Sequence, residues 1–420
     1  MIPQEVVTPL EMEAAGTKML ARATINIFGK YCNILARDFA FESKIYVSCI
    51  FCLFIACNPV NKDYQVKTKD INGYPMMICE EDSLGECVNI NLSELIDSLE
   101  IIQLENKDSA YFKPYWFTIS EHYIGIIQSL NTFKLFDRKG HFICNVGSVG
   151  QGPGEYIDIN DALIDEVYGY IYLAPSHGSK SILKYDLQGK FIKELCLNAD
   201  LFRPNLMHSS DSTIALTNMC FKDIGGDFVG ATISKSDGHI LKKVNYPPVV
   251  LNLNEGGHRA GLEHYMWSYR NTPNFSFKVT VSDTLYHYDY EYNKIEPVFT
   301  FNMKESRRGD SWFIFSELPF HYTVMIKDNG DVIIDKRTRK ASYFQLKNDI
   351  IGNSELPSCY LFKDGYFCKI LEPFELKETI TRALDTGNYN DNKKEYWANI
   401  ASSISDNDNS IILLGKLKTK

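Results

Sequence analysis

A β-hairpin motif recurs at constant spacing through the middle of the chain, and this repeat constrains the fold more than any other feature. The motif is an apolar strand, a turn that contains Asp and Gly, and a second apolar strand; its turn glycines are Gly140, Gly189 and Gly238. Successive turns are 49 residues apart, since 189 − 140 = 49 and 238 − 189 = 49. Asp supplies a side-chain acceptor and Gly tolerates positive φ, as tight turns require. A single hairpin cannot bury its faces, so the copies must stack.

Two weaker copies follow, in which Asn replaces Gly because Asn is the next best residue at positive φ. Their turns are placed at Asn293 and Asn348, which makes both intervals 55 residues. Each repeat also has an upstream pair of short strands, such as 169–173 before the second hairpin. Four short strands per repeat are typical of a β-propeller blade. A parallel β-helix would need shorter repeats, and a sandwich would show no fixed long period.

The sixth blade is expected to combine both ends of the chain. Its strands are placed at 360–362, 366–370, 410–414 and, from the N-terminal side, 99–104. A largely helical insertion is expected from about 376 to 405. Closure of this kind removes exposed sheet edges. The predicted fold is therefore all-β: a six-bladed β-propeller over residues 93–420 with a short C-terminal helical insertion.

Composition agrees with β structure and argues against one class of partner. Aromatic residues make up 13% of the chain, and aromatic side chains suit half-buried pleated surfaces. The net charge is −9, and no long run of Lys or Arg occurs. Nucleic acid is excluded as a partner, because binding phosphates needs clustered cations.

An apolar run near the N-terminus predicts export. Residues 45–56 are twelve uncharged residues, too few for a membrane-spanning helix but suited to the core of a signal peptide. The run ends at Ala56-Cys57, which resembles the lipobox of bacterial lipoproteins, although Phe54 departs from the usual small aliphatic residue. Cys57 is then the lipidated residue; a buried strand or short anchor helix is the alternative. Residues 1–57 are assigned to export and 58–92 to a tether.

The 44 residues before this run are unusual for a signal peptide, and Asp38 and Glu42 dilute its positive region. The true start is therefore hypothesised to lie downstream of Met1, at a non-standard start codon.

Two further cysteines, Cys79 and Cys87, flank a short acidic loop. In an oxidising compartment they are candidates for a local disulfide, and two free, partly buried thiols are the alternative.

Three stretches resemble one known family. They are 147–156 (GSVGQGPGEY), 282–286 with 297–301, and 405–412, where Ser410 replaces the usual Pro. With them the chain resembles the six-bladed β-propeller lipoproteins of Bacteroidetes, which are related to NHL-repeat propellers. The resemblance covers residues 90 to 417 and implies the fold. It carries over no catalytic residue.

The candidate binding residues come from two loops. In the first, Glu155 and Tyr156 follow a Gly-rich stretch and face a ligand at the propeller mouth, or else Glu155 is satisfied by backbone N–H groups in a tight connection between blades. In the second, Arg259, Glu263, Tyr265 and Trp267 form a plausible carbohydrate or peptide contact set to which His264 is added, with packing between blades as the alternative. No metal ligands, catalytic residues or cofactors are expected.

The functional expectation is a non-enzymatic binding or scaffold propeller in the bacterial cell envelope, lipid-anchored in the periplasm or at the outer-membrane surface. Its partner is a glycan, a peptide or an envelope protein. The alternative is a metal-dependent propeller hydrolase or lactonase, like the relatives of regucalcin, which hold a metal with carboxylates and an Asn at the channel. The fold alone does not decide between them.

Overall fold

The structure is a computed structural model, and it describes residues 65–420 except 72, 209, 223–224, 252–264, 281, 305–312, 328–329, 358–359 and 388–392. Residues 1–63 and 64–420 are separate units, and the second contains all the described structure. The expected signal segment and Cys57 therefore lie outside the described residues.

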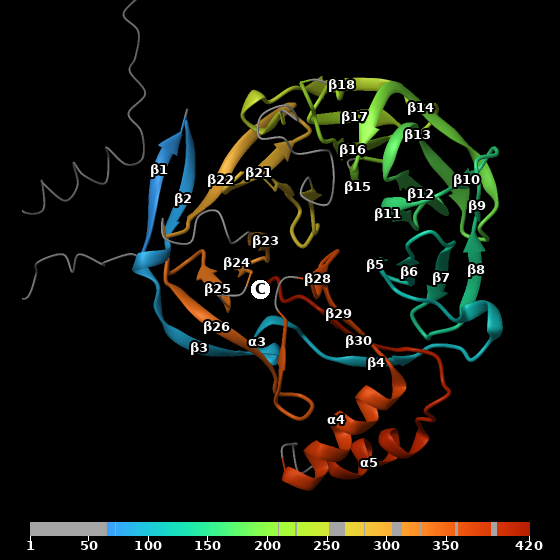
Figure 1. Ribbon diagram of the computed structural model, residues 1–420, viewed down its shortest axis with the longest axis vertical. Helices are drawn as coiled ribbons and strands as arrows, with labels where there is room; N and C mark the ends of the chain where they lie inside the picture. The colour runs from blue at the N-terminus through green and yellow to red at the C-terminus, as the bar shows by residue number, and fades with distance from the viewer. Residues whose placement is uncertain are drawn as a thin grey trace, which may run out of the picture. The chain divides into compact units, whose positions relative to one another are not determined.

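Six largely antiparallel sheets stand as blades around a central axis, and within each repeat the first strand lies nearest the axis (Figure 1). Strands from the N-terminal segment are added at the outer edges of three blades. Blade 1 contains β5 (Trp116–Ile119), β6 (Tyr123–Ile127), β7 (Phe133–Asp137) and β8 (Phe142–Val146). Blade 2 contains β11 (Ile159–Asp165), β12 (Tyr170–Pro175), β13 (His177–Asp186) and β14 (Phe191–Phe202). Blade 3 contains β15 (Asn205–His208), β16 (Thr213–Thr217), β17 (Gly230–Ser234) and β18 (Ile240–Val244).

The later blades carry additional strands from elsewhere in the chain. Blade 4 contains β19 (Met266–Trp267), β20 (Phe275–Val279), β21 (Thr284–Asp289) and β22 (Lys294–Asn302). Blade 5 contains β23 (Phe313–Glu317), β24 (His321–Ile326), β25 (Gly330–Asp335), β26 (Ala341–Asn348) and β27 (Ser354–Leu356). Blade 6 contains β28 (Phe362–Lys363), β29 (Tyr366–Leu371), β30 (Ile411–Lys416) and β4 (Glu100–Gln103). Short elements between blades are β9 (Ser148–Val149), β10 (Glu155–Tyr156), η2 (Asp108–Ala110) and η3 (Pro247–Val249).

The glycines of the 49-residue repeat have two structural roles. Gly140, Gly189 and Gly238 all have positive φ, as the turn between the third and fourth strands requires. A Cβ at Gly140 would also clash with the main-chain carbonyl of Gln103, on the outer strand of the neighbouring blade. Gly189 and Gly238 have the same close approach to the blade before them. The repeat therefore fixes both the turn and the contact between blades.

Asn293 confirms the predicted replacement of Gly by Asn in blade 4. Its φ is 55°, and its side-chain amide donates to the carbonyl of Lys243 at 2.9 Å, on the outer strand of blade 3. The hydroxyl of Tyr288 donates to the Asn293 side-chain oxygen at 3.0 Å. A side-chain hydrogen bond thus replaces the close main-chain approach that glycine permits.

The prediction of the fifth turn at Asn348 was wrong by one strand. The turn between β25 and β26 lies at Asp335–Lys340, and Arg339 takes the left-handed conformation there with φ 57°. The carboxylate of Asp335 accepts from the amides of Arg337 and Thr338, as the turn aspartates of the other repeats do. Since no Gly or Asn marks this turn, the sequence pattern shifted it to Asn348, which ends β26.

Blade 6 closes as predicted, because β30 pairs with the N-terminal strand β4 in the order β28-β29-β30-β4. The helical insertion is α4 (Pro373–Thr386) and α5 (Lys394–Ser403), which join β29 to β30 (Figure 1). Glu372 and Glu375 form a capping box at the start of α4, and Gly387 ends it in the left-handed conformation. The insertion packs against the blade through buried residues of both helices.

The segment expected as a tether is largely strand. β1 (Val66–Ile71) and β2 (Tyr74–Glu80) extend blade 4 outward, with β2 parallel to β22. After η1 (Glu81–Ser83), β3 (Gly85–Asn91) pairs in parallel with β26 of blade 5, and α3 (Leu92–Leu95) leads on to β4. Val66 and Cys79 are fully buried among Phe299, Phe301 and neighbours from blade 5. Covering these outer edges and apolar side chains explains why the segment is ordered.

Candidate functional site

The six innermost strands run in the same direction, so the residues that precede them lie at one end of the ring. Five described residues lie one or two positions before an innermost strand: Tyr115, Asp158, Arg203, Tyr265 and Tyr360. We call this end the start face. Loops at such an end are where propellers and similar scaffolds commonly carry binding residues.

Two tyrosines of the start face meet across the axis. The hydroxyl oxygens of Tyr115 and Tyr265 lie 3.3 Å apart, although their blades are three positions apart in a ring of six. Burial, and next the hydrogen bond to Tyr265, raise the pKa of Tyr115 to about 12. Its hydroxyl therefore stays protonated near neutral pH.

The Tyr265 ring is held between two neighbours. The guanidinium carbon of Arg203 lies 3.6 Å from its ring centroid, a close cation–π contact. Trp267 stacks on it with centroids 5.6 Å apart and ring planes 18° from parallel. Arg203 itself has φ 47°, which is uncommon for a residue other than Gly, Asn or Asp and is often found at ligand sites.

Asp158 brings a carboxylate beside this aromatic group. Its Oδ2 accepts from the Ser176 hydroxyl at 3.0 Å, whereas its Oδ1 is buried without a hydrogen-bond partner. The carbonyl of Ser176 in turn accepts from the Arg203 amide at 3.0 Å. Ser176 thus links Asp158 and Arg203 through two hydrogen bonds, which makes the two residues neighbours on the start face.

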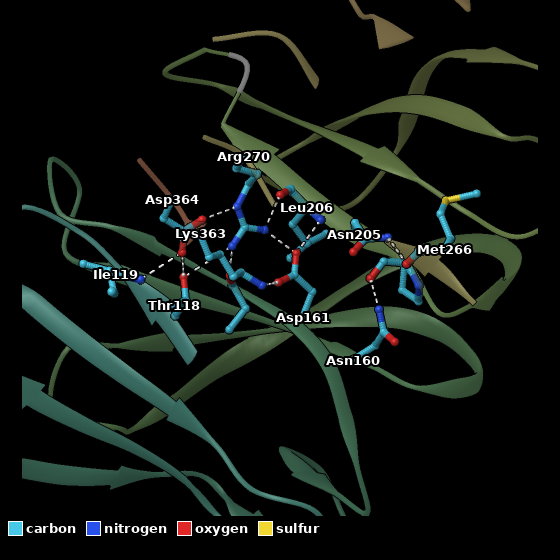
Figure 2. Close-up of polar contacts among 12 residues, drawn as sticks. Thr118, Ile119, Asn160, Asp161, Asn205, Leu206, Met266, Arg270, Lys363 and Asp364 are labelled. Atoms are coloured by element: carbon cyan, nitrogen blue, oxygen red, sulfur yellow. Dashed lines mark hydrogen bonds and ion pairs between the residues drawn. The ribbon is translucent and has the colours of Figure 1, made fainter. Parts of the chain in front are cut away.

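Below the start face, an ion-pair network crosses the axis (Figure 2). Arg270 donates through Nε to Asp364 at 2.6 Å and through Nη1 to Asp161, and the Lys363 amine binds Asp161 at 3.0 Å. Arg270 also donates to the carbonyls of Leu206 and Ala162 and to the Thr118 hydroxyl. The network joins inner strands or turns of blades 1, 2, 3, 4 and 6.

Burial and charge together set the pKa values in this network. Burial alone would raise the pKa of Asp161, but the Arg270 and Lys363 charges hold it below its ordinary value. Burial lowers the pKa of Lys363, and the paired carboxylates raise that of Arg270. Two cations and two carboxylates neutralise one another at the axis, which buried charges require.

The residues predicted from the first loop form hydrogen bonds within that loop and to blade 1. Gly152 donates its amide to Glu155 Oε2 at 2.8 Å, the backbone satisfaction given as the alternative. Tyr156 is 3% exposed; its hydroxyl donates to the carbonyl of Val146 at 2.5 Å and accepts from the Phe133 amide at 2.7 Å. Glu155 and Tyr156 thus link the loop to blade 1 and do not join the aromatic group on the axis.

Of the candidates in the second loop, Tyr265 and Trp267 are described; Tyr265 is part of the start face and Trp267 stacks on it. Arg259, Glu263 and His264 lie outside the described residues. Tyr115, Arg203 and Asp158 were not predicted from the sequence. Their common signal is a position one or two residues before an innermost strand, which becomes visible only once all six blades are placed.

The structure does not form the proposed disulfide: Cys79 is a buried free thiol on β2, and Cys87 is an exposed free thiol on β3. Among the described residues, no group of three His, Cys, Asp or Glu side chains could hold a metal ion. No helix in the described part of the chain is long and apolar enough to span a membrane.

Fold and site together define a six-bladed β-propeller with an aromatic start face above a neutralised ionic axis. The chain belongs to the family of a domain of unknown function, DUF4934, whose model matches residues 78–416. No curated protein matches its sequence. Among solved structures it is similar to a putative exported protein from Bacteroides fragilis (18% identity, 81% of this chain and 100% of that chain covered, TM-score 0.54). Another is a member of the DUF4221 family from Bacteroides vulgatus (12% identity, 78% and 98% covered, TM-score 0.43).

Proposed function

We propose that this protein is an exported, non-enzymatic binding propeller that takes its ligand at the start face. The observation that carries the proposal is the meeting of Tyr115 and Tyr265 across the axis, with Trp267 and Arg203 against the latter. Aromatic side chains and Arg are the residues that most often dominate binding energy at recognition surfaces. Such a group beside a channel mouth is a natural ligand platform.

Export and anchoring form the second part of the proposal. The apolar run 45–56 followed by Cys57 fits a lipoprotein signal, and in this proposal a lipid on Cys57 attaches the mature chain to a membrane. The similar propeller from Bacteroides fragilis is named a putative exported protein, which supports a location outside the cytoplasm. The relation to NHL-repeat propellers remains part of this proposal.

Binding is favoured over metal-dependent hydrolysis by the state of the axial carboxylates. Asp161 binds both Arg270 and Lys363, and Asp364 binds Arg270. Both carboxylates are thus already neutralised by protein cations at the position where a propeller hydrolase would use such groups for a metal.

The binding function is tested with the purified full-length protein on an array of neutral oligosaccharides and peptides. We expect binding to one of these classes, lost in Tyr265→Ala and Trp267→Ala and kept in the matched control Tyr292→Ala, whose ring is 72% exposed in a turn at the opposite end. Absence of binding to both classes, or binding that survives both start-face substitutions, would overturn it.

Anchoring is tested separately by cell fractionation. Cys57→Ser is expected to move the protein from the membrane to the soluble fraction, while Cys52→Ser, inside the apolar run, leaves it membrane-bound. Equal membrane retention of both variants would contradict lipidation at Cys57.

A further inference from the structure

The start face contains a carboxylate oxygen that needs a donor. Asp158 Oδ1 is buried and has no hydrogen-bond partner, while its other oxygen already accepts from Ser176. A buried polar atom without a partner costs stability, so such an atom is an indication of an absent group. Its partner must be a hydrogen-bond donor.

Arg203 is the complementary group. Among the described residues it forms no ion pair, and its guanidinium is fixed by the contact with the Tyr265 ring. Its backbone is held in the left-handed region at φ 47°. The guanidinium of Arg203 therefore offers N–H donors to an acceptor on a ligand. The carboxylate of Asp158, which lacks a donor, belongs to a neighbouring residue.

A ligand for this pair must donate and accept at neighbouring positions and also present an apolar face to aromatic rings. Adjacent hydroxyls of a sugar meet the first requirement, because each hydroxyl is both donor and acceptor. The C–H face of a pyranose ring meets the second. In a trans peptide unit the N–H and C=O point in opposite directions, so one unit cannot serve both groups. A phosphate has acceptors for Arg203 but is repelled by Asp158.

We infer that the ligand is a saccharide whose adjacent hydroxyls bind Asp158 and Arg203 while its ring packs on Tyr115. The inference rests on the proposed binding function and specifies its ligand class. Since Asp158 Oδ1 is closed to solvent in this structure, a neighbouring side chain must move for a hydroxyl to reach it. Tyr115 is suited to do so, because it is 56% exposed and its hydrogen bond to Tyr265 is a long one of 3.3 Å.

The experiment is titration calorimetry of the full-length protein with the neutral oligosaccharides that bind on the array, and with Gly-Gly as the peptide probe. Asp158→Asn and Arg203→Ala are expected to weaken saccharide binding by about 10- to 100-fold, the usual loss of a hydrogen bond to a charged group. The matched controls, Asp237→Asn and Arg337→Ala in turns at the opposite end, are expected to leave binding unchanged.

Tyr115 supplies a test that does not depend on removing a charge. Tyr115→Phe loses the hydrogen bond to Tyr265 but keeps the ring, so saccharide affinity is expected to stay or increase, whereas Tyr115→Ala is expected to reduce it. Circular dichroism confirms that each variant is folded, and Asp158→Glu and Arg203→Lys replace any that is not. Peptide binding without saccharide binding would overturn this inference and leave the binding function intact. Saccharide binding indifferent to Asp158 and Arg203 would overturn the assignment of the two residues and with it the inference.

Discussion

The Nε of Arg270 lies 2.6 Å from Oδ1 of Asp364, and this contact joins blades 4 and 6, which are not neighbours in the ring. The Arg270 side chain is 6% exposed and has φ 53° at its backbone, so a rare conformation directs a buried cation across the axis. The five contacts of its guanidinium go to residues of four other blades, so this side chain links most of the inner ring.

We expect Arg270→Ala to lower the free energy of unfolding by about 3–5 kcal/mol, because it leaves Asp161 and Asp364 buried without their main partner. Urea unfolding followed by circular dichroism measures the change. The control is Arg337→Ala, which removes an ion pair whose Arg side chain is 62% exposed and should cost about 1 kcal/mol at most. Similar losses for both variants would show that the axial network contributes little.

Lys278 predicts a pH dependence of stability. It is 2% exposed on β20, its amine lies 4.9 Å from the Phe313 ring centroid, and burial lowers its pKa to about 7. The unfolded chain has the ordinary, higher pKa, so it binds more protons between pH 7 and about 10. Stability should therefore rise with pH across this window, and the penalty for charging the buried amine is complete below pH 7.

Lys278→Met is expected to flatten this rise and to stabilise the protein at pH 7 by on the order of 1 kcal/mol or more. Guanidinium unfolding at pH 7, 8 and 9.5 measures the slope for both proteins. Lys139→Met, at an exposed turn, serves as the control and should keep the slope of the natural chain. Identical slopes for the natural chain and Lys278→Met would mean that Lys278 does not titrate in this range.

Two glycines give a prediction that separates the cost of a positive φ from the cost of a lost contact between blades. Gly140 and Gly330 both have positive φ, at 91° and 83°, but only Gly140 faces the Gln103 carbonyl, while nothing lies within 4 Å of a Cβ at Gly330. Gly330→Ala should lose about 1 kcal/mol from the backbone conformation alone, and Gly140→Ala clearly more. Melting temperatures of both variants test this. Equal losses would remove the proposed role of Gly140 in contact between blades.

The N-terminal strands are expected to be necessary for a stable ring. A chain that begins at Leu92 lacks β1 to β3, so it exposes the edges of β22 and β26 and uncovers Phe299 and Phe301. We expect a lower melting temperature and concentration-dependent aggregation, because unpaired edges associate. A chain that begins at Tyr64 retains β1 to β3, so its melting temperature and its aggregation should match those of the natural protein. Light scattering at increasing concentration distinguishes the two, and equal behaviour would contradict a stabilising role for β1 to β3.

The six-bladed fold could be predicted from sequence because its signals are local. Gly140, Gly189 and Gly238 mark turns that require positive φ, and Asn293 marks another. Arg339 adopts the same conformation without belonging to the residue types that favour it, so the fifth turn was misplaced. The pairings of β2 with β22 and of β3 with β26 were also invisible, since their partners lie more than two hundred residues away.

The site could be predicted only in part, for the same reason. Trp267 stands out through the composition of its loop. The role of Arg270 depends on ion pairs with Asp161 and Asp364, which are 109 and 94 residues away in the sequence. Tyr115 looks like an ordinary aromatic residue until the closed ring brings Tyr265 opposite it. Glu155 and Tyr156 were predicted because they follow a glycine-rich loop. In the structure Glu155 accepts a hydrogen bond within that loop, and Tyr156 donates one to blade 1.

The completion of blade 6 by β4 has a consequence for the order of folding. Residues 100–103 are made long before their partner strand, which begins at Ile411, so this pairing waits until that strand has left the ribosome. Joining segments so far apart is slow, because the entropy of closing the loop must be overcome before any contact forms. Assembly of the ring should therefore end with the pairing of β4 and β30, and a chain that ends before residue 411 would remain an open arc.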